Sequence, residues 1–213
     1  TYVAKEYKSN FKNEDYKKTV KTELPKNKNK NEDDSFIGID TQITLNLFEN
    51  LKYDLKSIRL GQSVKPVYLS KLPKDLKKIK STNKRKDTFI KIVMPLILNE
   101  NEKILEDRNK LFRILGKQSN TMGEKVWLKR RLKDYDVKGE DIAELKLRMD
   151  VVPTSIAIAQ AAKESGWGTS RFALEGNAMY GQWTWDGEGI EPSKKDKKKE
   201  HKILKFPKLQ SSV

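Results

Sequence analysis

The longest periodic pattern of apolar positions in this chain runs from Asp87 to Leu115. Apolar residues recur there at spacings of three and four, as they do on one face of an α-helix. Pro95 can bend this helix, and the polar stretch 99–101 can divide it. Gly116 then supplies a stop signal. The pattern therefore predicts one kinked helix or two consecutive helices.

Weaker patterns lie on both sides of this segment. Shorter helices are predicted over residues 123–135 and 140–149, and alternation over 64–69 predicts a short extended piece. A polar, Lys- and Asn-rich run near the N-terminus has no apolar period, so burial could not offset the entropy lost on ordering it. The chain is therefore divided into a disordered tail or tether (1–35), a partly packed arm (36–87) and a main helical domain (88–213).

The pattern changes in kind after residue 150. Pro153 opens a predicted helix, and the positions that follow it, up to Ala162, are small and apolar almost all round. Such a helix is expected at the centre of a domain. It ends on Glu164, and a small, turn-prone sequence, Ser165-Gly166-Trp167-Gly168, comes directly afterwards.

Composition limits the functions that the chain can have. Hydrophobic residues make up 36% and charged residues 35%, and 45 Lys and Arg against 30 Asp and Glu give a formal charge of +15. Such an excess favours an anionic partner, whether nucleic acid, a lipid surface or an acidic wall polymer, although a solvated Lys-rich surface needs no partner at all. The run Lys194–Lys199 has the same two interpretations, a solvated loop or attraction to anionic membrane or wall polymers.

Two residue types are nearly absent. The chain has no cysteine and a single histidine, His201, which disfavours a zinc hydrolase and a Ser–His triad. A catalytic zinc ion is therefore not expected. The longest apolar run, Phe89–Leu98, is too short to span a bilayer and contains Lys91. The chain begins at Thr1 without a leader, so we expect either a cytosolic protein or one whose export segment has been removed.

Glu164 is the residue whose setting suggests chemistry. A carboxyl group at the end of a buried helix would be partly desolvated, and it would lie at the negative end of the helix dipole. Both effects keep a carboxylic acid protonated near neutrality, as glycosidic cleavage requires of its proton donor. The alternative interpretation is an ordinary carboxylate at a helix end.

Two stretches together form a specific signature. The first runs from Pro153 through Ala161-Ala162-Lys163-Glu164-Ser165-Gly166-Trp167-Gly168-Thr169-Ser170, and the second is Asn177-Ala178-Met179-Tyr180-Gly181-Gln182. This signature closely resembles the Bax-type glucosaminidases, which belong to the endo-N-acetylglucosaminidase superfamily that includes flagellar autolysins. The resemblance is loose over about 46–213 and specific around 150–183.

The resemblance implies a fold and a function. The expected fold is mainly α (α+β lysozyme-like), with a small β-hairpin beside the active-site cleft. The expected substrate is peptidoglycan, with Glu164 as general acid, and the resemblance implies no metal or organic cofactor. The expected location is the cell envelope, either as an exported protein or behind a membrane tether that precedes Thr1. The family pattern continues past Val213, so the resemblance also predicts a catalytic domain truncated at its C-terminus.

A second catalytic group is harder to assign. Hydrolysis by two carboxylates needs a partner at ~5–5.5 Å for retention or ~6.5–9.5 Å for inversion. Asp186, Glu188 and Glu191 lie in the presumed hairpin, and Glu188, which lies between two glycines, is the predicted partner. A solvated turn acid is the competing interpretation.

Aromatic and amide side chains near the signature are candidate substrate contacts. Tyr180 and Trp183 are predicted to stack on sugar rings, with Trp185 also suitable, because each offers a flat apolar face. Asn177 and Gln182 are predicted to hydrogen-bond N-acetyl groups. Core packing or cross-strand pairing of the aromatic residues is the alternative.

Three other functions are alternatives to a glycan hydrolase. A lytic transglycosylase would use one glutamate as acid and then base, and its product would lack the added water of hydrolysis. A non-catalytic wall-binding protein would keep the fold without a complete site. Nucleic-acid binding depends on charge alone, because the excess of Lys over Arg is wrong for base reading and no nucleic-acid-binding motif is present.

Overall fold

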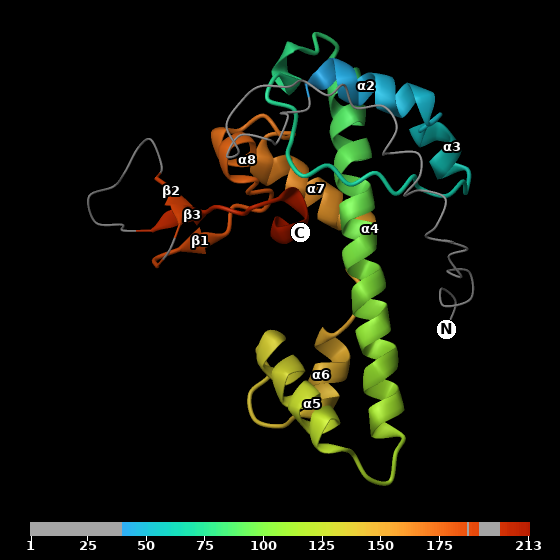
Figure 1. Cartoon of the computed structure of the whole chain (residues 1–213), viewed down its shortest axis with the longest axis vertical. Helices are drawn as coiled ribbons and strands as arrows, with labels where there is room; N and C mark the ends of the chain where they lie inside the picture. The colour runs from blue at the N-terminus through green and yellow to red at the C-terminus, as the bar shows by residue number, and fades with distance from the viewer. Residues whose placement is uncertain (1–39, 187, 192–200) are drawn as a thin grey trace, which may run out of the picture. The chain divides into compact units, whose positions relative to one another are not determined.

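The computed structural model describes residues 40–186, 188–191 and 201–213, and these residues form a mainly helical fold (Figure 1). The predicted tail 1–35 and the run Lys194–Lys199 lie outside the described residues. The helices are α2 (Thr41–Asn50), α3 (Leu55–Arg59), α4 (Thr82–Leu115), α5 (Met122–Asp134), α6 (Ile142–Arg148), α7 (Thr154–Ser165) and α8 (Arg171–Gly176), with 3₁₀ turns at Leu76–Lys78 and Leu209–Ser212. Of the helices in this part of the chain, none is long and apolar enough to cross a bilayer.

The predicted long helix is one continuous element of 34 residues, α4, which contains Pro95. It begins five residues earlier than expected because the Ser81 hydroxyl accepts a hydrogen bond from the Lys84 N–H and caps it. The polar stretch 99–101 does not divide it. Asn101 instead exchanges two hydrogen bonds with the backbone of Val152, at 2.8 and 3.1 Å, so its polar side chain anchors the segment before α7.

The other predicted helices, α5, α6 and α7, form within a few residues of their expected bounds. Helices α2, α3 and α8 were not predicted. The sequence feature that could have indicated them is a capping residue before each helix. Asp40, Asp54 and Ser170 each accept a hydrogen bond from a backbone N–H in the first turn that follows. Residues 64–69 join no sheet, and Val67 and Leu69 from this stretch are buried.

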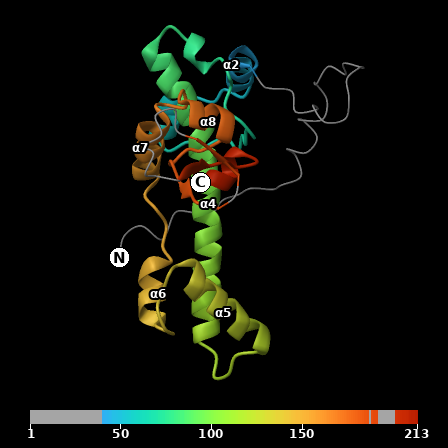
Figure 2. The same ribbon diagram turned by 90° about the vertical axis from the view of Figure 1, so that its left-hand side faces the viewer.

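Two separate hydrophobic cores form along α4. The first half of α4 contributes Phe89, Ile92, Val93 and Leu96 to a core shared with α2 and α7. In the second half, Leu111 packs with residues from and around α5 and α6. Figure 2 shows α5 and α6 beside this second half of the helix. Residues of the segment 40–87, including Phe48 and Leu72, are part of the first core.

A small antiparallel sheet completes the fold. Its strands are β1 (Trp183–Thr184), β2 (Gly189–Ile190) and β3 (Lys202–Leu204), in the order β1-β3-β2. Trp183 pairs with Ile203, and Ile190 pairs with the same Ile203 from the other side. The predicted mainly α, lysozyme-like fold class is confirmed. The expected hairpin is a three-stranded sheet instead, because the C-terminal segment inserts β3 between the other two strands.

Gly168, shortly after α7, packs directly against the first hydrophobic core. Its φ is +72°, and a Cβ there would lie 2.8 Å from a Phe89 ring carbon and 3.1 Å from a Leu72 methyl. Only glycine meets both conditions, because a side chain would be strained by the backbone angle and would overlap core atoms.

We expect Gly168→Ala to lower the free energy of unfolding by about 2–4 kcal/mol, the sum of left-handed strain and overpacking. Gly139→Ala is the matched control, since φ there is +67° and a Cβ would meet nothing within 4 Å. It should cost about 1 kcal/mol. Urea unfolding of both variants measures the difference, and equal losses would contradict the close approach at Gly168.

Candidate active site

The turn that follows α7 has a left-handed backbone over three successive residues. The φ angles are +58° at Gly166, +57° at Trp167 and +72° at Gly168. Trp167 is held in this unusual conformation by its ring, which packs edge-on against Phe89 at 5.8 Å and lies 4.8 Å from the Lys86 ammonium. These contacts give Trp167 a structural role, and they fix the direction in which the chain leaves the helix.

The Ser165 hydroxyl joins the two sides of this turn. It is fully buried, donates to the Ala161 carbonyl at 2.5 Å and accepts from the Gly168 N–H at 2.9 Å. The Ser165 carbonyl accepts from the N–H groups of Thr169 and Ser170. The Ser165 carbonyl that the helix end leaves unpaired and the N–H groups of the turn are thus satisfied locally, which makes the turn rigid.

Glu164 directly precedes this rigid turn, and its side chain is exposed. The expected partial burial is therefore wrong, and so is the expectation of a central helix. The face of α7 that carries Ala157, Ala161 and Ser165 is buried, whereas Gln160 and Lys163 face solvent with Glu164. Alanine on every side of a helix does not distinguish a central helix from a surface one, because exposing so small a side chain costs little.

The carboxylate of Glu164 lies beside Gly181. A Cβ on Gly181 would be 3.8 Å from Glu164 Oε2, and φ at Gly181 is +64°. Within the described residues Glu164 makes no hydrogen bond and no ion pair. The two surface cavities found between α2 and α4 do not include it. The carboxylate is therefore free to meet a molecule arriving from solvent over Gly181.

Asn177 and Gln182 hold the segment that carries Gly181. Asn177 is 4% exposed, and its amide nitrogen donates to the Phe206 carbonyl at 2.9 Å. The Gln182 amide donates to the Ser212 carbonyl at 2.9 Å, and its backbone carbonyl accepts from the Leu204 N–H. Both side chains thus position the segment through their amide nitrogens, and their contacts with N-acetyl groups stay a prediction.

Tyr180 is half-buried against the first core. Its hydroxyl donates to the Ala157 carbonyl at 3.3 Å, and burial raises the pKa of its phenol above the ordinary value. Only part of the ring faces outward, so it offers less stacking surface than the sequence suggested. The hydrogen bond instead links the Gly181 segment to the first turn of α7.

Trp183, Trp185 and His201 form an exposed group, here called the aromatic ledge. Trp183 is 56% and Trp185 is 68% exposed. The two indoles meet edge to face at 6.3 Å, and the His201 ring stacks on Trp183 at 4.3 Å with an interplanar angle of 22°. Two tryptophans separated by one residue share a strand face, a signal that was readable from the sequence. His201 is distant from them in sequence, and the pairing of β1 with β3 brings it beside Trp183.

Glu188 is exposed and directly precedes β2. Its backbone carbonyl accepts from the Lys205 N–H at 3.1 Å. Its role as a second catalytic group stays a prediction. Among residues 40–186, 188–191 and 201–213, no group of three or more His, Cys, Asp and Glu side chains could hold a metal ion.

Comparison with known proteins relates this region to a family. Residues 139–213 match the glucosaminidase family, described as mannosyl-glycoprotein endo-beta-N-acetylglucosaminidase. The C-terminal part of this chain is therefore similar to the glucosaminidases. The chain is also 37% identical over 118 residues to Protein bax of Escherichia coli (strain K12), a match that covers 53% of this chain and 43% of the relative. No solved structure matches the chain significantly.

The glucosaminidase region contains every catalytic and substrate-binding residue predicted from the sequence. It begins before α6 and includes α7, the turn, the Gly181 segment and the sheet. Helices α2, α3, α4 and α5 lie outside it. The chain spans less than half the length of the curated relative that it matches.

We expect Ser165→Ala to lower the free energy of unfolding by about 1–3 kcal/mol, because the buried Gly168 N–H would lose its acceptor. Ser57→Ala is the control, since the Ser57 hydroxyl bonds to Asp54 at the exposed surface. It should change stability by less than about 0.5 kcal/mol. Chemical denaturation measures both, and equal losses would argue against the Ser165 bridge as the support of the turn.

Proposed function

We propose that this protein cleaves glycosidic bonds next to N-acetylglucosamine in peptidoglycan, with Glu164 as general acid. The observation that carries the proposal is a carboxylate without an internal partner, held at a rigid turn in a region that matches the glucosaminidase family. An acid that must give its proton to a substrate cannot have its oxygens occupied by protein donors. The location proposed for this activity is the cell envelope.

The substrate itself would supply the low-dielectric surroundings that the free protein does not give Glu164. A sugar ring lying over Gly181 would displace water from around the Glu164 carboxyl group. The glycosidic oxygen, a poor leaving group until protonated, would then receive the proton.

Gly181 would set how closely the sugar can approach. Because glycine lacks a side chain, a ring can come within contact distance of Glu164 Oε2, where a Cβ would otherwise stand 3.8 Å away. The hydrogen bonds of Tyr180 and Gln182 would keep this surface in place against α7 and the C-terminal turn.

Glu188 is the proposed partner carboxylate. It would act as base or nucleophile if the glycan brings it close to the bond that Glu164 protonates. Where Glu164 alone serves as acid and then base, the reaction becomes that of a lytic transglycosylase. The two reactions differ in product mass, since hydrolysis adds one water and transglycosylation adds none.

Substitution of Glu164 tests the proposal directly. We expect Glu164→Gln to lower the rate of glycan-strand cleavage by at least about a hundredfold, because the amide cannot donate the proton. Glu140→Gln, at an exposed position of the same region, should keep the native rate. Mass spectrometry of the released fragments measures both rate and product type. A Glu164→Gln variant as active as the native chain would contradict the proposal, and a native chain that binds without cutting would indicate a wall-binding protein.

The aromatic ledge provides the proposed stacking surface for the glycan. We expect Trp185→Ala to weaken binding of glycan fragments roughly fivefold, since a stacking indole contributes about 1 kcal/mol. Leu147→Ala removes an apolar side chain that is 76% exposed in the same family region, and it should leave the affinity unchanged. Calorimetric titration in the Glu164→Gln background measures the affinities. An equal effect of both substitutions would contradict stacking at the ledge.

A further inference from the structure

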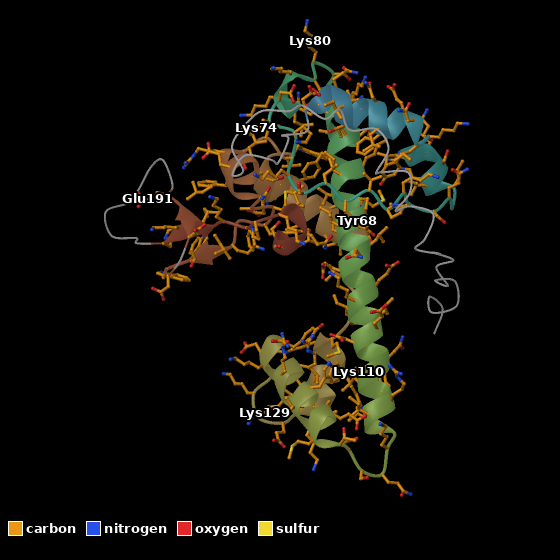
Figure 3. All side chains as sticks on the ribbon, viewed as in Figure 1. Tyr68, Lys74, Lys80, Lys110, Lys129 and Glu191 are labelled. Atoms are coloured by element: carbon orange, nitrogen blue, oxygen red, sulfur yellow. The ribbon has the colours of Figure 1, made fainter. Side chains whose placement is uncertain are left out.

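The segment 71–86 carries the densest positive charge among the described residues. It contains eight Lys and Arg residues and one acidic residue, Asp75. Six of its lysines are exposed and are here called the lysine ridge: Lys71, Lys74, Lys77, Lys78, Lys80 and Lys84. Figure 3 shows Lys80 projecting outward from the loop that leads into α4. The exposed side chains of the ridge are therefore all positively charged.

The backbone under the ridge is pinned to the protein. Leu72, Leu76 and Ile79 are 3%, 0% and 8% exposed, so apolar side chains point inward between the outward lysines. The Asp75 carboxylate accepts from both the N–H and the hydroxyl of Thr41, at 2.9 and 2.8 Å. The lysines therefore stand on a defined surface, in contrast to the cations of a disordered tail.

Four of the six ridge lysines have no acidic partner among the described residues. Asp75 is also the acid nearest to Lys78, at 3.9 Å, and Lys74, Lys77, Lys80 and Lys84 form no ion pair with the described residues. The first turn of α4 contains no acid, although the positive end of a helix dipole favours one there. Mutual repulsion in this segment lowers the stability of the fold, and bound anions would relieve it.

The ridge borders the turn that supports Glu164. Leu72, within the ridge segment, lies at the position where a Cβ on Gly168 would meet it at 3.1 Å. Lys86, at the end of the segment, has its ammonium 4.8 Å from the Trp167 ring. The segment that carries the ridge therefore packs directly on the turn that follows Glu164.

We propose that the lysine ridge binds the free carboxylates of the stem peptides on the peptidoglycan strand that Glu164 cuts, an inference that rests on the proposed function. Stem peptides are flexible and carry their carboxylates at varied positions. Lysine suits such a ligand, because its ammonium is a point charge on a flexible stem. No large exposed apolar side chain lies between residues 71 and 86, so the ridge lacks the anchors of a membrane-inserting surface.

Binding to insoluble peptidoglycan tests this inference in the full chain with Glu164→Gln, so that cleavage plays no part. The ridge variant replaces four lysines by glutamine: Lys74, Lys77, Lys80 and Lys84. The matched control changes the charge equally on and just after α5: Lys125, Lys129, Lys133 and Lys138. We expect the ridge variant to bind at least about tenfold more weakly at low salt, with the difference shrinking as salt rises, and the control to bind within about twofold of the parent.

A second substrate separates carboxylate binding from glycan binding. Strands from which an amidase has removed the stem peptides should bind the ridge variant and its parent equally. If the ridge variant loses as much affinity for these bare strands, or if the α5 control loses as much as the ridge variant, the proposal is wrong. Ridge-dependent binding to phosphatidylglycerol vesicles but not to peptidoglycan would also overturn it, in favour of a membrane surface. Because these assays measure binding alone, they give an answer even if Glu164 proves not to be catalytic.

Discussion

The two hydrogen bonds of the Ser165 hydroxyl are the constraint on which the candidate site depends. By donating to Ala161 and accepting from Gly168, this hydroxyl allows three left-handed residues to follow a helix without a buried unpaired N–H. This left-handed turn places Glu164 at the surface and Gly168 against Phe89 and Leu72. The backbone that carries the Glu164 side chain is thereby fixed on its C-terminal side.

The long helix α4 connects this site to the rest of the fold. Its first half supplies Phe89, which touches Trp167 and lies against Gly168, so the core and the turn share the same ring. Its second half belongs to a separate core with α5 and α6. The glucosaminidase region thus packs on elements that lie outside it in sequence, and the segment 71–86, which ends in the first turns of α4, is held against the turn after Glu164 by this packing.

Local signals were enough to predict much of the fold. The three- and four-residue spacing of α4, the helices α5 and α6, and the boundary between α7 and its turn were all readable, because they depend on neighbours in sequence. The division at 99–101 was a wrong expectation because Asn101 finds its partner in Val152, about fifty positions away. The short helices α2, α3 and α8 had caps but too few periodic positions to stand out.

For the site, the sequence by itself determined which residue types meet around residue 164. The Glu-Ser-Gly-Trp-Gly block requires a sharp turn after a helix, and together with the stretch 177–182 it carried the likeness to the glucosaminidases. Only the tertiary structure decided which face of α7 is buried, that Asn177 and Gln182 bind backbone carbonyls, and that His201 stacks on Trp183. The physical reason is that burial, cross-strand stacking and side-chain pairing depend on residues distant in sequence, whereas helix periodicity and turn chemistry depend on adjacent ones.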